Sequence, residues 1–114
     1  MACAELYHDH LHDIDGLRVA PRVRDGSHTY LYYPVEVPEK LALQRFMIAN
    51  GRDVAIQHTP NCAELEAYRA FQADCPLARQ AYRGTLMLPT YPGYSFEQVR
   101  RNARVIRQFF NQPS

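Results

Sequence analysis

Two histidines near the start of the chain have the spacing of metal ligands. On a helix, His8 and His12 share a face at positions i and i+4, as two zinc ligands would. A closed zinc site needs four ligands, and no further ligand follows at a fixed spacing. Alternating histidine and aspartate is also typical of a solvated first helix, and the sequence favours that interpretation. We therefore predict no metal site.

His58 is the second candidate for chemistry. It stands at the end of an expected strand, directly before a turn at Thr59 and Pro60 and an expected helix that starts at Asn61. In layered folds this is a common position for binding residues. The alternative is a partly buried histidine that bonds to nearby backbone, and the spacing alone leaves both interpretations open.

Arginines are concentrated on the last expected helix, at Arg100, Arg101, Arg104 and Arg107. Such a group can hold phosphates, but it is also the solvated back of a helix whose cations lie near the favourable C-terminal end of the dipole. The formal net charge of only +1 favours the second interpretation, because it provides no global field to recruit nucleic acid or anionic lipid.

Composition places the chain among small globular proteins. At 114 residues with 46% hydrophobic content it is long enough for one domain. The first residues lack the charged and apolar regions of a secretory signal, and no apolar run is long enough to cross a membrane. Three widely spaced cysteines indicate reduced thiols and no disulfide framework. We expect a cytoplasmic protein that binds neither membranes nor nucleic acid.

The last third of the chain is the clearest structural unit. Residues 86–88 form a short apolar run, which two prolines and a glycine end. Ser95 then begins a helix, and Gln98 completes a capping box. Apolar residues recur along that helix at Phe96, Val99, Ala103, Ile106 and Phe110. We predict a strand, a rigid turn and an amphipathic helix.

Alternating apolar residues and turn signals outline the other elements. Further strands are expected over residues 17–23, 28–37 and 54–58. Helices are expected over residues 2–13, 38–50, 61–72 and 76–84. Pro34 removes a ladder donor, so its strand is an edge strand or has a free edge near its end. The predicted fold class is α+β: a two-layer sandwich with a small, mostly antiparallel sheet of about three strands and helices on one face.

Two of these helices carry apolar stripes that need a cover. The helix over 61–72 has Asn61 as its N-cap and an inner face of Leu65, Tyr68 and Phe71 or Gln72. The helix over 38–50 has a main stripe of Leu43, Phe46 and Met47, with Leu41 and Ile48 on nearly the opposite side. One small sheet cannot cover both sides of that helix. Either a second layer of this chain covers Leu41 and Ile48, or a partner does.

Several short motifs in order and spacing resemble one family. They are AIQH at 55–58, NCAEL at 61–65, DCPLA at 74–78, LPTYP at 88–92 and EQVRRN at 97–102. Together they resemble the C-terminal domain of DegT/DnrJ/StrS-type aminotransferases, the pyridoxal-phosphate-dependent sugar aminotransferases of fold type I. The resemblance runs from about residue 17 to residue 110, so the whole chain, 1–114, is expected to be this one domain. It implies a small domain that packs on a large cofactor-binding domain within a dimer.

The resemblance also implies what the chain lacks. The Schiff-base lysine and the groups that hold pyridoxal phosphate belong to the family's large domain, so we expect no cofactor bound by this chain alone. The one lysine, Lys40, falls in the first turn of an expected helix, an exposed place where nothing desolvates the amine. We therefore expect no catalytic residue here, and activity in amino-sugar biosynthesis only after docking on a large domain.

Two site residues follow from the resemblance. The turn around His58 and Asn61 corresponds to the segment where the family's small domain approaches the substrate, so both are predicted substrate-binding residues. The role of Asn61 as a helix cap explains the same residue without a ligand. A second function stays open, that of a stand-alone, non-catalytic interaction or dimerisation module that kept the fold.

Overall fold

A four-stranded antiparallel sheet, formed by described residues, lies at the centre of the protein. The computed structural model describes residues 2–21, 27, 30–56 and 61–111. The sheet order is β1-β2-β4-β3, and the strands are β1 (Arg18–Val19), β2 (Tyr32–Glu36), β3 (Ala55–Ile56) and β4 (Thr85–Pro89). The α+β class and the antiparallel sheet are confirmed. The sheet has four strands where about three were predicted. Two of the four, β1 and β3, are only two residues long.

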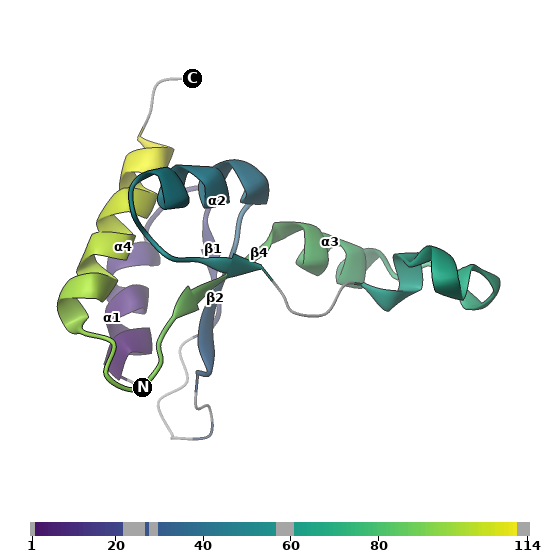
Figure 1. Cartoon of the computed structure of the whole chain (residues 1–114), viewed down its shortest axis with the longest axis horizontal. Helices are drawn as coiled ribbons and strands as arrows, with labels where there is room; N and C mark the ends of the chain where they lie inside the picture. Colours follow the sequence, from purple (N-terminus) through teal and green to yellow (C-terminus); the bar gives the residue numbers. More distant parts are fainter. Residues whose placement is uncertain (1, 22–26, 28–29, 57–60, 112–114) are drawn as a thin grey trace.

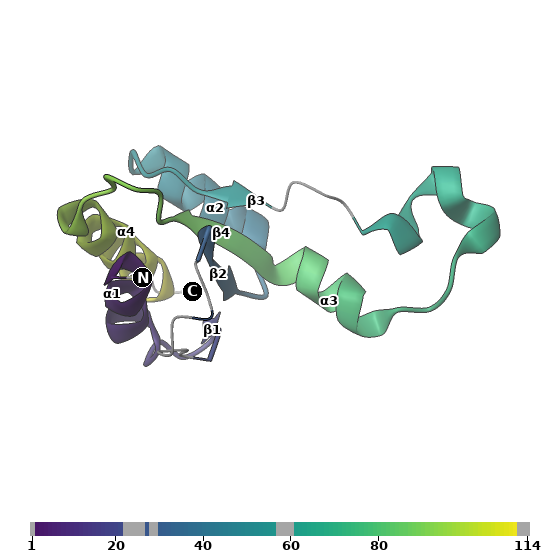
Figure 2. The ribbon, with the colours of Figure 1, turned by 90° about the horizontal axis from the view of Figure 1, so that it is seen from below.

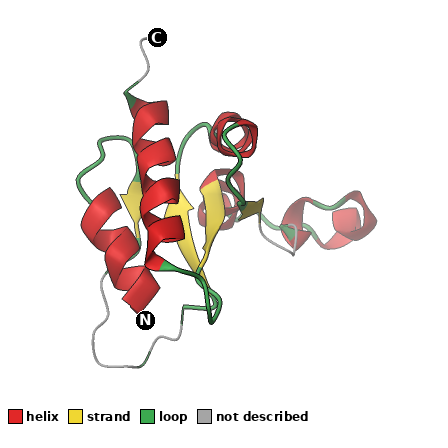
Figure 3. Cartoon of the chain, turned by 60° about the vertical axis from the view of Figure 1, so that its left-hand side comes forward, coloured by secondary structure: helices red, strands yellow, loops and turns green. Residues whose placement is uncertain are grey.

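Helices cover one side of this sheet. The described helices are α1 (Ala2–Leu11), α2 (Lys40–Ala49), α3 (Pro76–Gly84) and α4 (Phe96–Phe110), with 3₁₀ segments η1 (Cys62–Glu64) and η2 (Glu66–Phe71). Helices α1, α2 and α4 pack on the sheet, whereas α3, η1 and η2 project away from it (Figure 1). Helices α1 and α4 lie side by side across the sheet (Figure 3). Alternate residues Tyr33 and Val35 of β2 and Leu86 and Leu88 of β4 are buried beneath them, as period-two alternation requires.

Pro34 shows how β2 tolerates a residue that cannot donate to the ladder. It pairs with Met87 of β4, while β1 pairs only with Val35 and Glu36. Pro34 therefore lies beyond the end of β1, beside an edge that no described strand occupies. The predicted free edge is confirmed, although β2 itself lies between two strands.

Helix α4 follows its sequence pattern closely. The Ser95 hydroxyl accepts a hydrogen bond from the backbone N–H of Gln98 at 3.2 Å, and Val99, Ala103 and Ile106 are buried. The reciprocal half of the capping box does not form, because the Gln98 side chain instead accepts from Arg52 at 2.7 Å. Phe96, predicted on the buried stripe, is about half exposed at the start of the helix.

The segment from Asn61 to Gly84, called the arm below, projects away from the rest of the molecule, called the body (Figure 1, Figure 2). The prediction of a helix over 61–72 with a buried inner face is wrong. Every residue from 61 to 83 is described and none is buried; Phe71 is 85% exposed. Two 3₁₀ segments form there, because no sheet lies beneath the arm on which an amphipathic α-helix could bury its apolar face.

A buried polar network joins α1, α4 and the end of β4. The Tyr7 hydroxyl donates its proton to the Pro89 carbonyl at 2.9 Å, so its oxygen accepts from Asn102 Nδ2, also at 2.9 Å. The same amide donates to the Tyr94 hydroxyl at 2.8 Å. Tyr7 and Asn102 are completely buried. The fully buried amide of Asn102 therefore links Tyr7, near the start of the chain, to Tyr94, near its end.

Substituting Asn102 tests this network. We expect Asn102→Ala to lower the free energy of unfolding by about 2–3 kcal/mol, because the buried Tyr7 hydroxyl and the partly buried Tyr94 hydroxyl lose their donor and a small cavity opens. Urea unfolding measures the change. Gln108→Ala, on an exposed position of the same helix, is the control and should stay within about 0.5 kcal/mol of the parent. Equal effects in the two variants would contradict the role of the network.

Alkaline unfolding tests the burial of Tyr7. Burial raises the pKa of the Tyr7 phenol well above its ordinary value of 10.0, although the hydrogen bond from Asn102 opposes this. Above that ordinary value the unfolded chain loses this proton while the folded chain keeps it, so the free energy of unfolding falls as the pH rises.

We expect the stability difference between the parent and Tyr7→Phe to be constant below about pH 9 and to shrink by about pH 11. Urea unfolding at a series of pH values measures it. Because both proteins contain the same other titrating groups, their contributions cancel. A difference that stays constant across this range would show that the phenol ionises equally in both states.

Candidate functional site

The candidate site lies on the arm, which begins in the sequence at Asn61, three residues after His58. His58 is outside the described residues, so its predicted role stays a prediction. Asn61 is the N-cap of η1: its Oδ1 accepts from the backbone N–H of Ala63 at 3.4 Å. The capping role is confirmed. Its amide Nδ2 is buried and has no hydrogen-bond partner among the described residues.

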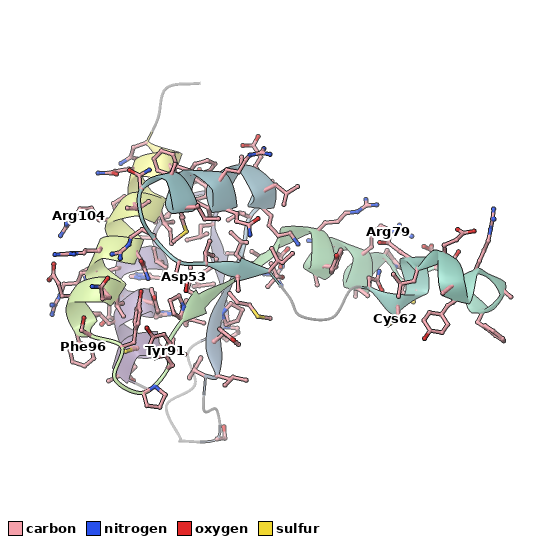
Figure 4. The ribbon with its side chains drawn as sticks, in the orientation of Figure 1. Asp53, Cys62, Arg79, Tyr91, Phe96 and Arg104 are labelled. Atoms are coloured by element: carbon pink, nitrogen blue, oxygen red, sulfur yellow. The ribbon has the colours of Figure 1, made fainter. Side chains whose placement is uncertain are left out.

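Asn61 lines a polar hollow of about 650 Å³ on the arm. Its charged lining residues are Glu64, Asp74, Arg79 and Arg83. Figure 4 shows Cys62 and Arg79 on this arm, far from Asp53, Tyr91, Phe96 and Arg104 on the body. The hollow therefore has a polar lining with two acidic and two basic side chains, and it lies on the arm.

Arg79 organises the hollow. Its Nε donates to Glu64 at 2.7 Å and its NH2 group donates to Asp74 at 3.0 Å. Glu64, and after it Asp74, raises the pKa of the Arg79 guanidinium above its usual value. The two carboxylates come from η1 and from the turn before α3, so the Arg79 side chain links helix α3 to both of these segments.

Sequence reasoning missed this ion-pair group. Glu64 and Arg79 are 15 residues apart, and no helical or strand period connects them. The only local signal was Asp74, which precedes the Cys75–Pro76 start of α3. Whether Arg79 reaches Glu64 depends on how the chain between them runs in space, and the sequence did not indicate this.

Lys40 requires a correction. It was predicted to be exposed with nothing to desolvate the amine, but it is only 7% exposed. Its Nζ donates to the Tyr82 carbonyl and lies 4.6 Å from the centre of the Tyr82 ring. Burial lowers the pKa of its ammonium below the usual value. The prediction failed because α3, which is remote in sequence, returns to cover the first turn of α2.

His8 lies in the last turn of α1, and His12, one residue beyond the end of that helix, lies beside it as the i, i+4 spacing predicts. Their rings stack with centroids 5.2 Å apart, and His12 Nδ1 lies 2.9 Å from the His8 carbonyl oxygen. Within the described residues, no group of three or more potential metal ligands comes together. Nor does any described helix have the length and apolar character needed to cross a membrane.

Exposed apolar side chains lie on both the body and the arm. Leu41 and Ile48 on the outer side of α2 are 55% and 58% exposed, so no described layer of this chain covers them. Phe71 and Leu77 on the arm are more exposed still. These surfaces are where a further domain or a second chain can pack.

Removing the Arg79 bridge tests the order of the arm. We expect Arg79→Gln to speed amide hydrogen exchange of residues 62–75 about fivefold, because two surface ion pairs that close the arm are lost. Exchange followed by mass spectrometry measures it. Arg69→Gln is the matched control, because among the described residues Arg69 forms an ion pair only with Glu66, three residues away, at 3.0 Å. The same acceleration in both variants would show that the bridge does not hold the arm.

The comparisons with known proteins agree with this architecture. Residues 1–107 match the model of the DegT/DnrJ/EryC1/StrS aminotransferase family. No curated protein matches the sequence. The fold is similar to DesV of S. venezuelae, solved with a ketimine intermediate, at a TM-score of 0.89 and 20% identity over 99% of this chain.

Two more structures extend this likeness. DesI, solved in the presence of its TDP-sugar product, has a TM-score of 0.84 and 27% identity over 97% of this chain. NtdA from Bacillus subtilis, solved with bound cofactor PMP, has a TM-score of 0.84 and 14% identity over 97% of this chain. The chain spans only 31%, 30% and 27% of DesV, DesI and NtdA. On its sequence match the chain belongs to the DegT/DnrJ/EryC1/StrS aminotransferase family.

Proposed function

We propose that this chain is the C-terminal, small domain of a pyridoxal-phosphate-dependent sugar aminotransferase and that it works when docked on a large cofactor-binding domain. Family membership supports the reaction class. The 30% of DesI that the chain spans supports its status as one part of a larger enzyme, and the TDP-sugar product in that structure supports a nucleotide-linked sugar as substrate. We place this assembly in the cytoplasm.

The observation that carries the proposal is the unburied arm. A segment from residue 61 to residue 83 without one buried side chain gains little by itself from folding in this shape. Its exposed Phe71 and Leu77 gain burial only when another surface covers them. A large domain that packs on the arm supplies that surface and brings the polar hollow to the edge of an active site.

The described residues do not themselves fit the cofactor. A Schiff base needs a lysine amine directed into a cofactor site. Lys40, the one lysine of the chain, directs its amine to the Tyr82 carbonyl instead. The large domain therefore has to supply both the lysine and the pocket for pyridoxal phosphate, which in the assembled enzyme supplies the amino-transfer chemistry.

The role left to this chain is to bind and orient the sugar. Asn61 uses its Oδ1 to cap η1, while its Nδ2 has no partner among the described residues and can donate to a sugar or phosphate oxygen. His58 precedes it by three residues in the sequence, so it is proposed to contact the same substrate. Neither residue is proposed to bond covalently to the substrate.

A second function, a non-catalytic dimerisation module, is favoured by a different observation. Leu41 and Ile48 form an exposed apolar pair on α2, away from the arm. A second copy that packed on this pair would bury it without any large domain. Under that function the arm hollow has no substrate to bind.

A chimaera tests the proposed function. We would replace the matching 30% of DesI by this chain and measure transamination of its sugar substrate. We expect an active chimaera in which Asn61→Asp raises KM for the sugar about tenfold, because the cap acceptor remains while the donor to the substrate is lost. Asn50→Asp, at the exposed C-cap of α2, is the control and should leave KM unchanged.

Two results would overturn the proposal. One is transamination by the purified chain alone with added pyridoxal phosphate, accompanied by an imine absorbance that Lys40→Ala abolishes. The other is a chain that never supports activity in the chimaera and forms a dimer that Leu41→Glu dissociates, which would establish the dimerisation module instead.

A further inference from the structure

The C-terminal end of α3 is held by Lys40, the first residue of α2, and by Val37 in the connection between β2 and α2. The last carbonyls of a helix have no donor within the helix. Here the Tyr82 carbonyl accepts from Lys40 Nζ, and the Gly84 carbonyl accepts from the backbone N–H of Val37 at 2.8 Å. Both donors lie more than 40 residues earlier in the sequence, so this is a tertiary cap.

The environment of Lys40 suits a cation in spite of its burial. Its ammonium lies at the negative end of the α3 dipole and over the electron-rich face of the Tyr82 ring, at 4.6 Å from the centroid. Burial of a lysine is unfavourable unless such partners offset the loss of water. Twelve of the thirteen basic residues are arginines, and this enclosed site holds the single compact ammonium of the chain.

The same place is the mechanical base of the arm. Helix α3 ends at Gly84 and β4 begins at Thr85, so no loop separates the arm from the sheet. Gln80 Nε2 also donates to Glu36 Oε1 at 3.1 Å. A Cβ on Gly84 would lie only 3.0 Å from Glu36 Cγ, so a larger residue would require the Glu36 side chain to shift.

We propose that Lys40 is a positioning residue: by capping the C-terminus of α3 from α2, it fixes the direction in which the arm leaves the body. The arm carries Asn61 and Arg79, so the direction set at this base decides where the polar hollow lies. The cap itself is formed by this chain's own residues. Its consequence for catalysis rests on the proposed function.

Hydrogen exchange on the full chain tests the cap directly. In Lys40→Met we expect amides of residues 76–84 to exchange about tenfold faster or more, the factor that corresponds to one lost hydrogen bond from a charged donor. Amides of β2 and α4 should keep their parental rates. Lys40→Arg retains a cation and should restore part of the protection. Arg45→Met, an exposed cation on the same helix, is the control and should change nothing.

A second measurement needs no substitution. Because the chain has one lysine, mass spectrometry of a tryptic digest reports acetylation of Lys40 by acetic anhydride without overlap from other lysines. We expect the folded chain to react at least about tenfold more slowly at Lys40 than the chain in urea, since a closed cap shields the amine. Equal rates in the two states would overturn the proposal even if Lys40→Met failed to fold.

Other outcomes are equally decisive. Unchanged exchange over residues 76–84 in Lys40→Met, or equal acceleration across the whole body, would show that Lys40 does not act on the arm.

In the chimaera, Lys40→Met should raise KM for the sugar and leave kcat nearly unchanged, because the arm binds substrate and takes no part in bond making. An inactive chimaera with exchange localised as expected would refute the proposed function and leave the cap standing.

Discussion

The pairing of β2 with β4 is the constraint on which the rest of the structure depends. It joins residues about 50 positions apart in five register pairs, from Tyr32 with Pro89 to Glu36 with Thr85. One side of this pair is buried under α1 and α4, and the end of β4 receives the hydrogen bond from Tyr7. Because α3 enters β4 without a loop, the same pairing also sets the root of the arm.

The body and the arm differ in which side chains they bury. In the body, an amide and a phenol are fully buried, and each has hydrogen-bond partners that hold elements distant in sequence. In the arm, polar side chains pair with one another at the surface while Phe71 and Leu77 face solvent. The body therefore encloses a buried core, whereas residues 61–83 of the arm contribute no buried side chain.

Buried polar side chains link helices of this fold that are distant in the sequence. Asn102 decides how α1 and α4 meet, and Lys40 decides how α2 meets α3. Apolar contacts tolerate small rotations of one helix against another, whereas a buried donor tolerates few because it must keep its acceptor.

Local patterns in the sequence determined most of the elements and the family. Alternating residues in β2, proline at the start of α3 and the Ser95 cap of α4 act over a few residues, so spacing alone was enough to predict them. The motifs from 55 to 102 were likewise sufficient for the family.

Tertiary structure alone decided the features that matter for the site. The burial of Lys40 depends on Tyr82, 42 residues away, and the arrangement of the hollow depends on Arg79 reaching Glu64 across 15 residues. The exposed face of the arm had the same apolar spacing as a buried helix, because spacing reports which residues share a face and not whether another layer of the chain lies against that face.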